Sequence, residues 1–161
     1  MGRELRSEDL AFLDCAPVRQ VHVGELDLPA DRVFEELTGH PEKWPRWFSV
    51  VRDCGYGGDP PYGVGTVRRI SFRGGVLARE KVLAWDENKR FAYRIDELNV
   101  PGVWAFMEDW TLESVSDGST RMRWVLAADF SKPMELVFRA SWAPIQRVFR
   151  RGTHRMESVA E

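Results

Sequence analysis

Cysteine is scarce in this sequence, which contains only Cys15 and Cys54. Two cysteines this far apart give no disulfide framework, and no Cys-x-x-Cys pair is present to hold zinc. Long apolar runs are missing too, because no stretch approaches the ~20 apolar residues that cross a bilayer, and Met1–Asp14 lacks the apolar core of a signal peptide. The sequence therefore predicts reduced thiols, no stable membrane insertion and a cytoplasmic location.

An excess of charge of either sign is also absent. The 161 residues carry a net charge of −2, with a pI near 6.0, so no strong field favours nucleic acid. The sequence contains no Gly-x-Ser-x-Gly elbow, phosphate loop, dinucleotide fingerprint or His-Glu-x-x-His helix, and His22, His40 and His154 fall in separate predicted elements. We therefore expect no cofactor, no metal and no nucleic-acid partner.

Short apolar segments separated by turn residues make up most of the chain. Gln20–Leu28 alternates as a first strand, Ala30–Leu37 has the spacing of a short helix, and the prolines of Pro41–Phe48 limit that segment to a second short helix. Turns rich in Gly, Asp, Asn and Pro then separate further strands. The six predicted strands are Val50–Tyr56, Gly65–Phe72, Val76–Trp85, Arg90–Leu98, Val103–Val115 and Thr120–Phe130.

The C-terminal segment Met134–Ser158 has apolar residues at helical intervals and predicts one long helix, which Pro144 should bend. A chain of this length usually forms one domain. We therefore predict an α+β fold: a seven-stranded antiparallel sheet wrapped around the C-terminal helix, with two short helices after the first strand. The domain is expected to span residues 1–161, with residues 1–17 as an N-terminal extension.

Period-two spacing assigns the large apolar side chains of three adjacent strands to one face. The opposite face carries charged residues such as Arg94, Asp109, Arg121 and Arg123, as a solvated face does. One helix cannot cover a strongly curved sheet at close packing, so either side chains fill the space or a cavity remains. The residues assigned to the apolar face include Phe91, Tyr93, Trp104, Phe106, Trp110, Met122 and Trp124.

Glu108 interrupts this apolar face between two aromatic residues. An unpaired carboxylate there would be costly, so we expect Glu108 on the inner face with a partner, and Glu80, Arg68 and Arg69 are the candidates to pair with it or perturb it. A buried carboxyl with a shifted pKa is a candidate acid or base. The alternative is a structural ion pair or a position nearer the rim.

Several segments match a known family when they are taken in order and spacing. They are Val21–Leu28 with Pro29–Phe34, Pro41–Trp47, Gly63–Arg68, Glu80–Asp86 with Arg90–Tyr93, and Gly118–Trp124. Over residues 18–158 the chain resembles the START-like superfamily, often called SRPBCC, and its polyketide cyclase/dehydrase and lipid-transport proteins. The resemblance implies a helix-grip fold, in which the curved sheet grips the C-terminal helix.

The resemblance implies more than one activity, because similar domains cyclise or dehydrate polyketides, carry lipids, or only bind. The leading hypothesis is a cavity between the sheet and the C-terminal helix that binds an apolar small molecule, such as a lipid or polyketide. Arg69 and Glu108 would orient its polar end. The residues expected to contact the ligand are Arg69, Phe91, Tyr93, Trp104, Phe106, Glu108, Trp110, Met122 and Trp124.

Two alternatives come from other classes of function. The first is a metal-free polyketide cyclase, aromatase or dehydrase that uses the same pocket, with Glu108 and Tyr93 as candidate catalytic residues. The second is a partner-binding role for the basic face of the last helix, which Arg147 and Arg151 would carry, although such a face is ordinarily only solvated.

Overall fold

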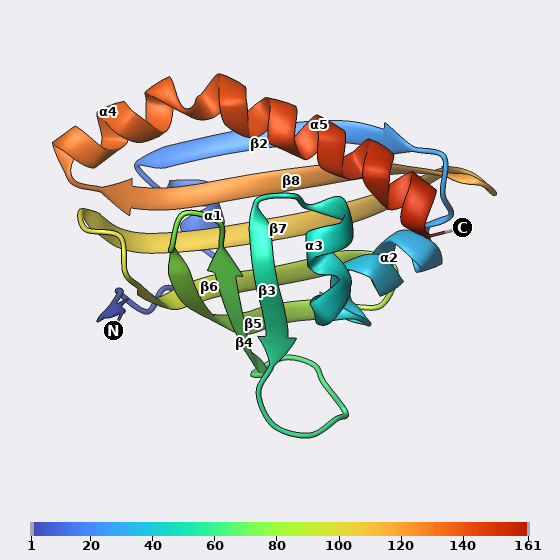
Figure 1. Ribbon diagram of the computed structural model, residues 1–161, viewed down its shortest axis with the longest axis horizontal. Coiled ribbons are helices and arrows are strands. Elements are labelled where there is room, and N and C mark those ends of the chain that lie inside the picture. The colour runs from blue at the N-terminus through green and yellow to red at the C-terminus, as the bar shows by residue number, and fades with distance from the viewer. Residues whose placement is uncertain (1, 161) are drawn as a thin grey trace.

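The computed structural model describes residues 2–160, and most of them belong either to one antiparallel sheet or to the helices packed on it (Figure 1). The order across the sheet is β2-β8-β7-β6-β5-β4-β3, which confirms the predicted seven-stranded antiparallel sheet, and β1 is an added short strand beside β6. The strands are β1 (Arg3–Glu4), β2 (Val18–Leu26), β3 (Val51–Tyr56), β4 (Val67–Phe72), β5 (Leu77–Asp86), β6 (Arg90–Leu98), β7 (Val103–Ser116) and β8 (Ser119–Phe130).

Short helices follow β2, as predicted. α2 (Ala30–Thr38) is followed by the 3-10 turn η1 (Pro41–Lys43) and by α3 (Trp44–Trp47). Pro41 and Pro45 each lie in the opening turn of a helical segment. Backbone N–H groups in that turn make no hydrogen bond within the helix, so proline, which has no N–H, is tolerated there. These two prolines therefore divide the region into short segments, and α3 brings two tryptophans into the core.

The C-terminal helix is long but interrupted. It forms α4 (Lys132–Ala140) and α5 (Trp142–Val159), which Figure 1 shows as an arc along β2 and β8. The predicted long C-terminal helix is present, and the irregularity expected from Pro144 is an interruption at Ser141, three residues earlier, that divides it into two helices. Pro144 has no N–H to donate to the carbonyl of Ala140, so the hydrogen-bond ladder breaks there and Pro144 lies in the first turn of α5. None of the helices in residues 2–160 has both the length and the apolar character needed to span a membrane.

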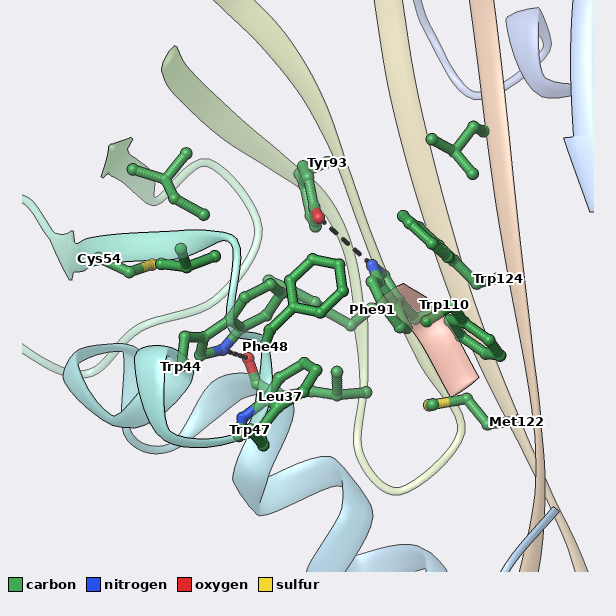
Figure 2. Packing of buried hydrophobic residues seen from close by; sticks show 14 of the residues in the cluster. Leu37, Trp44, Trp47, Phe48, Cys54, Phe91, Tyr93, Trp110, Met122 and Trp124 are labelled. Atoms are coloured by element: carbon green, nitrogen blue, oxygen red, sulfur yellow. Dashed lines mark hydrogen bonds between the residues drawn. The ribbon is translucent and has the colours of Figure 1, made fainter. Parts of the chain in front are cut away.

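The main core lies between the inner face of the sheet and the helices α2, α3 and α5. Figure 2 shows Trp44, Trp47 and Phe48 packed toward Trp110 and Trp124 of the sheet. Trp110 and Trp124 are stacked with ring centroids 4.8 Å apart, and offset aromatic pairs of this kind add stability beyond the area that they bury. This layer of rings fixes α3 and α5 over the sheet.

The outer face of the sheet is partly covered by the N-terminal segment. Helix α1 (Phe12–Cys15) places Phe12 and Leu13 in a second apolar cluster with Met107 and Val125, side chains of β7 and β8 that point away from the main core. The expectation that this face is wholly solvated is therefore wrong beneath α1. The charged residues Arg94, Asp109, Arg121 and Arg123 do share this outer side, and Asp109 is buried in an ion pair with Arg90.

Candidate ligand site on the inner face

The predicted inner-face aromatics lie together in the main core, which confirms the period-two assignment of their strands. All are buried except Phe106, which is partly buried and packs against the others. Strand β7 pairs with β6 on one side and with β8 on the other, so the three sets of side chains form one continuous surface. The residues are Phe91, Tyr93, Phe106, Trp110, Met122 and Trp124.

Trp104 and Arg69 lie elsewhere, and these two assignments to the inner face are wrong. A β-bulge between Val103 and Ala105 interrupts the alternation of β7, so Trp104 is 37% exposed and its ring lies 4.3 Å from the guanidinium carbon of Arg3. Arg69 is exposed on the outer face, because its neighbour Arg68 takes the inner position of β4. A shift of one residue along a strand moves a side chain to the opposite face.

Arg69 lines a groove on the outer face that has a volume of about 770 Å³. Arg79 and Glu97 also line this groove and form an ion pair with 2.7 Å between Arg79 Nε and Glu97 Oε1. The inner-face aromatics do not contribute to it. The groove is therefore separate from the site predicted from the sequence.

Glu108 lies on the inner face, as predicted, and receives two hydrogen bonds. The hydroxyl of Tyr93 donates to Glu108 Oε2 at 2.7 Å, and the indole N–H of Trp124 donates to the same oxygen at 2.8 Å. Tyr93 and Glu108 occupy paired positions of β6 and β7, while Trp124 comes from β8. The partners of Glu108 are thus neutral donors rather than Arg68, Arg69 or Glu80. Arg68 Nε donates to Glu80, while the buried Nη1 and Nη2 atoms of Arg68 have no hydrogen-bond partner.

The Glu108 carboxyl is almost enclosed by protein but not sealed from solvent. Protein surrounds it, and this burial, with the nearby charge of Glu80, raises its pKa from 4.5 to about 7 even though Tyr93, Trp124 and Arg68 oppose the rise. Its side chain nevertheless keeps part of its surface in contact with solvent. A carboxyl with this pKa gains or loses its proton near neutral pH, and solvent is in contact with it.

Tyr93 acts as a hydrogen-bond donor at this site. Burial, followed by the charge of Glu108, raises the pKa of the Tyr93 phenol well above its ordinary value of 10.0. The hydroxyl therefore keeps its proton. It donates a hydrogen bond to Glu108 and accepts one of 3.3 Å from the indole N–H of Trp110 (Figure 2). These contacts fix the orientation of the Glu108 carboxyl, and they do not suit Tyr93 to act as a base.

Arg68 and Glu80 form an ion pair that is sealed from solvent. Arg68 Nε donates to Glu80 Oε2 at 2.6 Å, and the exposed fractions of the two side chains are 0% and 2%. The Arg68 guanidinium carbon lies 4.3 Å and 4.4 Å from the ring centroids of Trp44 and Tyr93, which is cation–π geometry. Burial lowers the pKa of Arg68, but Glu80, Cys54, Tyr93 and Tyr56 together outweigh burial and raise this pKa above its ordinary value, so Arg68 stays charged.

His22 of β2 is a further buried polar group on this face. Its ring stacks 4.7 Å from both Trp142 and Phe149, and its Nε2 atom is buried without a hydrogen-bond partner. Burial, and then the charge of Arg150, lowers the pKa of His22, so the ring is neutral near pH 7. Period-two spacing from the buried Val18 would have identified His22 as inward-facing.

Apolar side chains of α4 and of the first turns of α5 are only partly buried, although they pack against the core. The ring of Phe138 lies 6.4 Å from that of Phe106, yet no residue of α4 is buried. Helix α5 becomes tightly packed only from Phe149 onward. The half of the site under α4 and the first turns of α5 is therefore less densely covered than the other half. The partly buried apolar residues here are Phe106, Met134, Phe138, Trp142, Ile145 and Val148.

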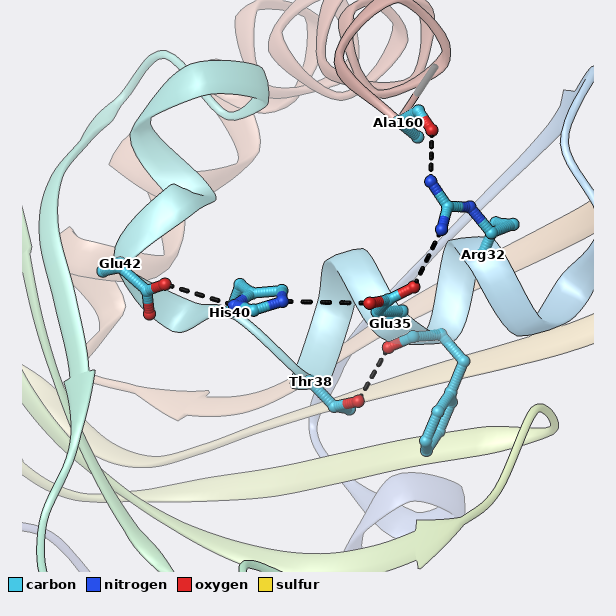
Figure 3. Close-up of polar contacts among 7 residues, drawn as sticks. Arg32, Glu35, Thr38, His40, Glu42 and Ala160 are labelled. Carbon is cyan, nitrogen blue, oxygen red and sulfur yellow. Dashed lines mark hydrogen bonds and ion pairs between the residues drawn. The ribbon is translucent and has the colours of Figure 1, made fainter.

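The other polar residues singled out in the sequence lie at the surface. His40 is 3.3 Å from Glu42 and 3.8 Å from Glu35, and Glu35 also contacts Arg32, so these residues form a surface row (Figure 3). Arg147 and Arg151 are exposed on α5. In residues 2–160 there is no group of three or more His, Cys, Asp and Glu placed to hold a metal ion.

A family comparison agrees with this architecture. Residues 19–161 match the model of a family described as polyketide cyclase / dehydrase and lipid transport. The chain belongs to this family. An uncharacterised protein of Mycobacterium tuberculosis is 32% identical over 133 residues, which cover 81% of this chain and 78% of that protein.

Solved structures of other proteins share the family fold at low sequence identity. A START superfamily protein from Mycobacterium smegmatis has a TM-score of 0.71 at 11% identity, covering 88% of this chain and 98% of that one. The Zhui aromatase/cyclase from a Streptomyces species has a TM-score of 0.69 at 15% identity, covering 89% and 93% of the two chains. The di-domain aromatase/cyclase BexL has a TM-score of 0.72 at 18% identity, and the match covers 87% of this chain but 46% of BexL. These likenesses show a START-like, helix-grip fold.

Proposed function

We propose that this protein binds an apolar small molecule, such as a lipid or polyketide, between the inner face of the sheet and the helices α4 and α5. The observation that carries the proposal is Glu108, a carboxyl surrounded by protein yet still in contact with solvent. The aromatic surface around it supplies apolar contact area, and burial of such area provides roughly 25 cal/mol per Å² before ordering costs. Glu108 would hold the polar end of the ligand.

The partly buried side chains of α4 and α5 support an entry route on that side. Phe138, Ile145 and Val148 contact the core without being sealed into it, so a ligand could displace water from their exposed surfaces. The aromatic layer beyond Phe149 is closely packed and forms the closed end of the site. The ligand is therefore expected under α4 and the first turns of α5.

Displacement of the neutral fluorescent probe N-phenyl-1-naphthylamine by 1-dodecanol tests this proposal. Ile145→Trp adds bulk between α5 and the sheet and should weaken binding of both the probe and the alcohol. Leu136→Trp is the control: it adds the same ring on α4 at a position that is 69% exposed, and binding should stay unchanged. Leu77→Trp places the ring in the outer groove. Loss of binding in Leu77→Trp, with normal binding in Ile145→Trp, would indicate that the ligand binds in the outer groove and contradict the proposed site.

A second candidate function is metal-free cyclisation or dehydration in the same pocket. The pKa of about 7 at Glu108 favours it, because an acid or base works best when its pKa is close to the working pH. Dehydration of a β-hydroxy ketone to the conjugated ketone, followed by ultraviolet absorbance, tests this activity. Turnover that Glu108→Gln removes would support an enzyme, and binding without turnover would favour a carrier or receptor.

A further inference from the structure

The charges on the inner face do not balance when Glu108 is ionised. Arg68 of β4 and Glu80 of β5 neutralise each other at 2.6 Å. Glu108 of β7 is in contact with Tyr93 of β6 and Trp124 of β8, both uncharged, and no ion pair in residues 2–160 includes it. His22 of β2, behind Trp124, is neutral because burial lowers its pKa. The polar cluster of the inner face therefore carries one net negative charge.

Both donors from the protein to Glu108, the Tyr93 hydroxyl and the Trp124 indole, contact the same oxygen, Oε2. The other carboxylate oxygen of Glu108, Oε1, accepts no hydrogen bond from either of these donors. An ionised carboxylate has about four acceptor positions on its two oxygens. Because the side chain is in contact with solvent, a donor group on a ligand has access to the remaining positions.

The one buried cation of the site is not available to a ligand. Arg68 has no exposed surface, and the rings of Trp44 and Tyr93 lie over its guanidinium group at 4.3 Å and 4.4 Å. An anionic ligand beside Glu108 would therefore meet its carboxylate while Arg68 is out of reach. The charge of the exposed Arg150 of α5 acts on His22 of this face, whereas the charges that act on Glu108 are those of Glu80 and Arg68. Like charges at close range in a poorly solvated site are strongly unfavourable.

A partly exposed aromatic ring on this side of the sheet favours positive charge. It is not that of Trp124, which is buried and stacks on Trp110 at 4.8 Å and on Phe149 at 5.3 Å. The ring of Trp142, on the helix above, is only partly buried. Ring faces attract ammonium groups, most strongly in the case of tryptophan.

We infer that this pocket selects apolar ligands whose polar end donates hydrogen bonds, as an ammonium or hydroxyl group does, and discriminates against ligands that end in a carboxylate. The inference rests on the proposed function and adds the chemical class of the ligand to it. Glu108 is the residue that determines this specificity, and Tyr93 and Trp124 position its carboxyl.

Three ligands with the same chain test the inference: dodecylamine, 1-dodecanol and dodecanoate, each below the concentration at which it forms micelles. At pH 8 dodecylamine should displace N-phenyl-1-naphthylamine at a concentration about tenfold lower than dodecanoate, with 1-dodecanol between them. The ionised fraction of a carboxyl with a pKa of about 7 rises roughly tenfold from pH 6 to pH 8, so the affinity for dodecylamine should rise by up to about tenfold over that range.

Glu108→Gln should remove both the preference for the amine and its dependence on pH, while 1-dodecanol still binds. Glu113→Gln is the matched control, because it removes the same charge from an exposed position on the same strand and should leave both effects unchanged. Dodecanoate binding as tightly as dodecylamine at pH 8, or an amine preference that survives in Glu108→Gln, would overturn the inference and leave the proposed function standing. Failure of all three ligands to bind would overturn the proposed function, and the inference with it.

Discussion

Tyr93 and Glu108 occupy paired positions on adjacent antiparallel strands, and the hydroxyl of Tyr93 donates to Glu108 Oε2 over 2.7 Å. Trp124, from the strand on the other side of β7, donates to the same oxygen. Strand register alone therefore brings three side chains of distant sequence position to one point on the inner face. The local chemistry of the site depends on this register.

The pH dependence of stability should differ between the wild type and Glu108→Gln. The folded-state pKa of Glu108 is raised from 4.5 to about 7, so its contribution to stability is fully present below pH 4.5 and is lost as the pH rises to 7. Relative to Glu108→Gln, the wild type should lose on the order of 3 kcal/mol over this range, because a tenfold change in proton affinity corresponds to about 1.4 kcal/mol. Urea unfolding of both proteins at several pH values measures this difference, and parallel curves would contradict the raised pKa.

Single substitutions in the Arg68–Glu80 pair should be more harmful than replacement of both residues. Glu80→Gln leaves a fully buried guanidinium without its counter-charge and should cost about 3–5 kcal/mol of unfolding free energy. The double variant Arg68→Met with Glu80→Leu removes both charges and should be more stable than Glu80→Gln. Chemical denaturation compares the variants, and a double variant less stable than Glu80→Gln would contradict the cost assigned to the unpaired guanidinium.

The contact between α5 and α3 should not tolerate added bulk at Gly152. A β-carbon at this position would lie 3.2 Å from Phe48 Cδ2 and 3.5 Å from the Trp47 carbonyl oxygen. Gly152→Val should therefore destabilise the protein by about 1–3 kcal/mol, as overpacking does. Arg151→Val introduces the same β-branched side chain at the adjacent exposed position and should cost about 0.5 kcal/mol or less in thermal or urea unfolding. Equal effects of the two variants would indicate that α5 does not pack on α3 at this point.

The N-terminal segment should stabilise the sheet from its outer side. Phe12→Ala empties a position in the cluster with Met107 and Val125, and large-to-small changes at buried phenylalanines cost about 3–5 kcal/mol. Because this cluster is small and peripheral, we expect a cost near the lower value, together with increased binding of a hydrophobic dye. Glu4→Ala, at an exposed position of β1, is the control. A Phe12→Ala protein as stable as the wild type would show that α1 does not cover the sheet in solution.

Much of the sheet could be predicted because its strands alternate cleanly between large apolar and charged residues. Phe91, Trp110 and Trp124 were placed on the correct face by spacing alone, and all three are buried in the main core. Glu108 was placed by the same argument, since its strand is regular at that point.

The errors have different causes. The error at Arg69 was avoidable, because period-two spacing assigns Arg68, not Arg69, to the same face as the buried Ile70. Trp104 lies at a β-bulge, which shifts the alternation by one residue without a sequence signal. The contact of α1 with the outer face joins residues more than ninety positions apart, Phe12 and Met107, and depends on tertiary packing.

The most direct test of the central claim is an isotope-filtered NOE experiment on the labelled protein with unlabelled 1-dodecanol. The proposed site predicts NOEs from the ligand methylene groups to Phe106, Ile145 and Val148, and from the carbon that bears the hydroxyl to residues beside Glu108. NOEs confined to Leu77 and Arg69 would place the ligand in the outer groove and contradict binding on the inner face.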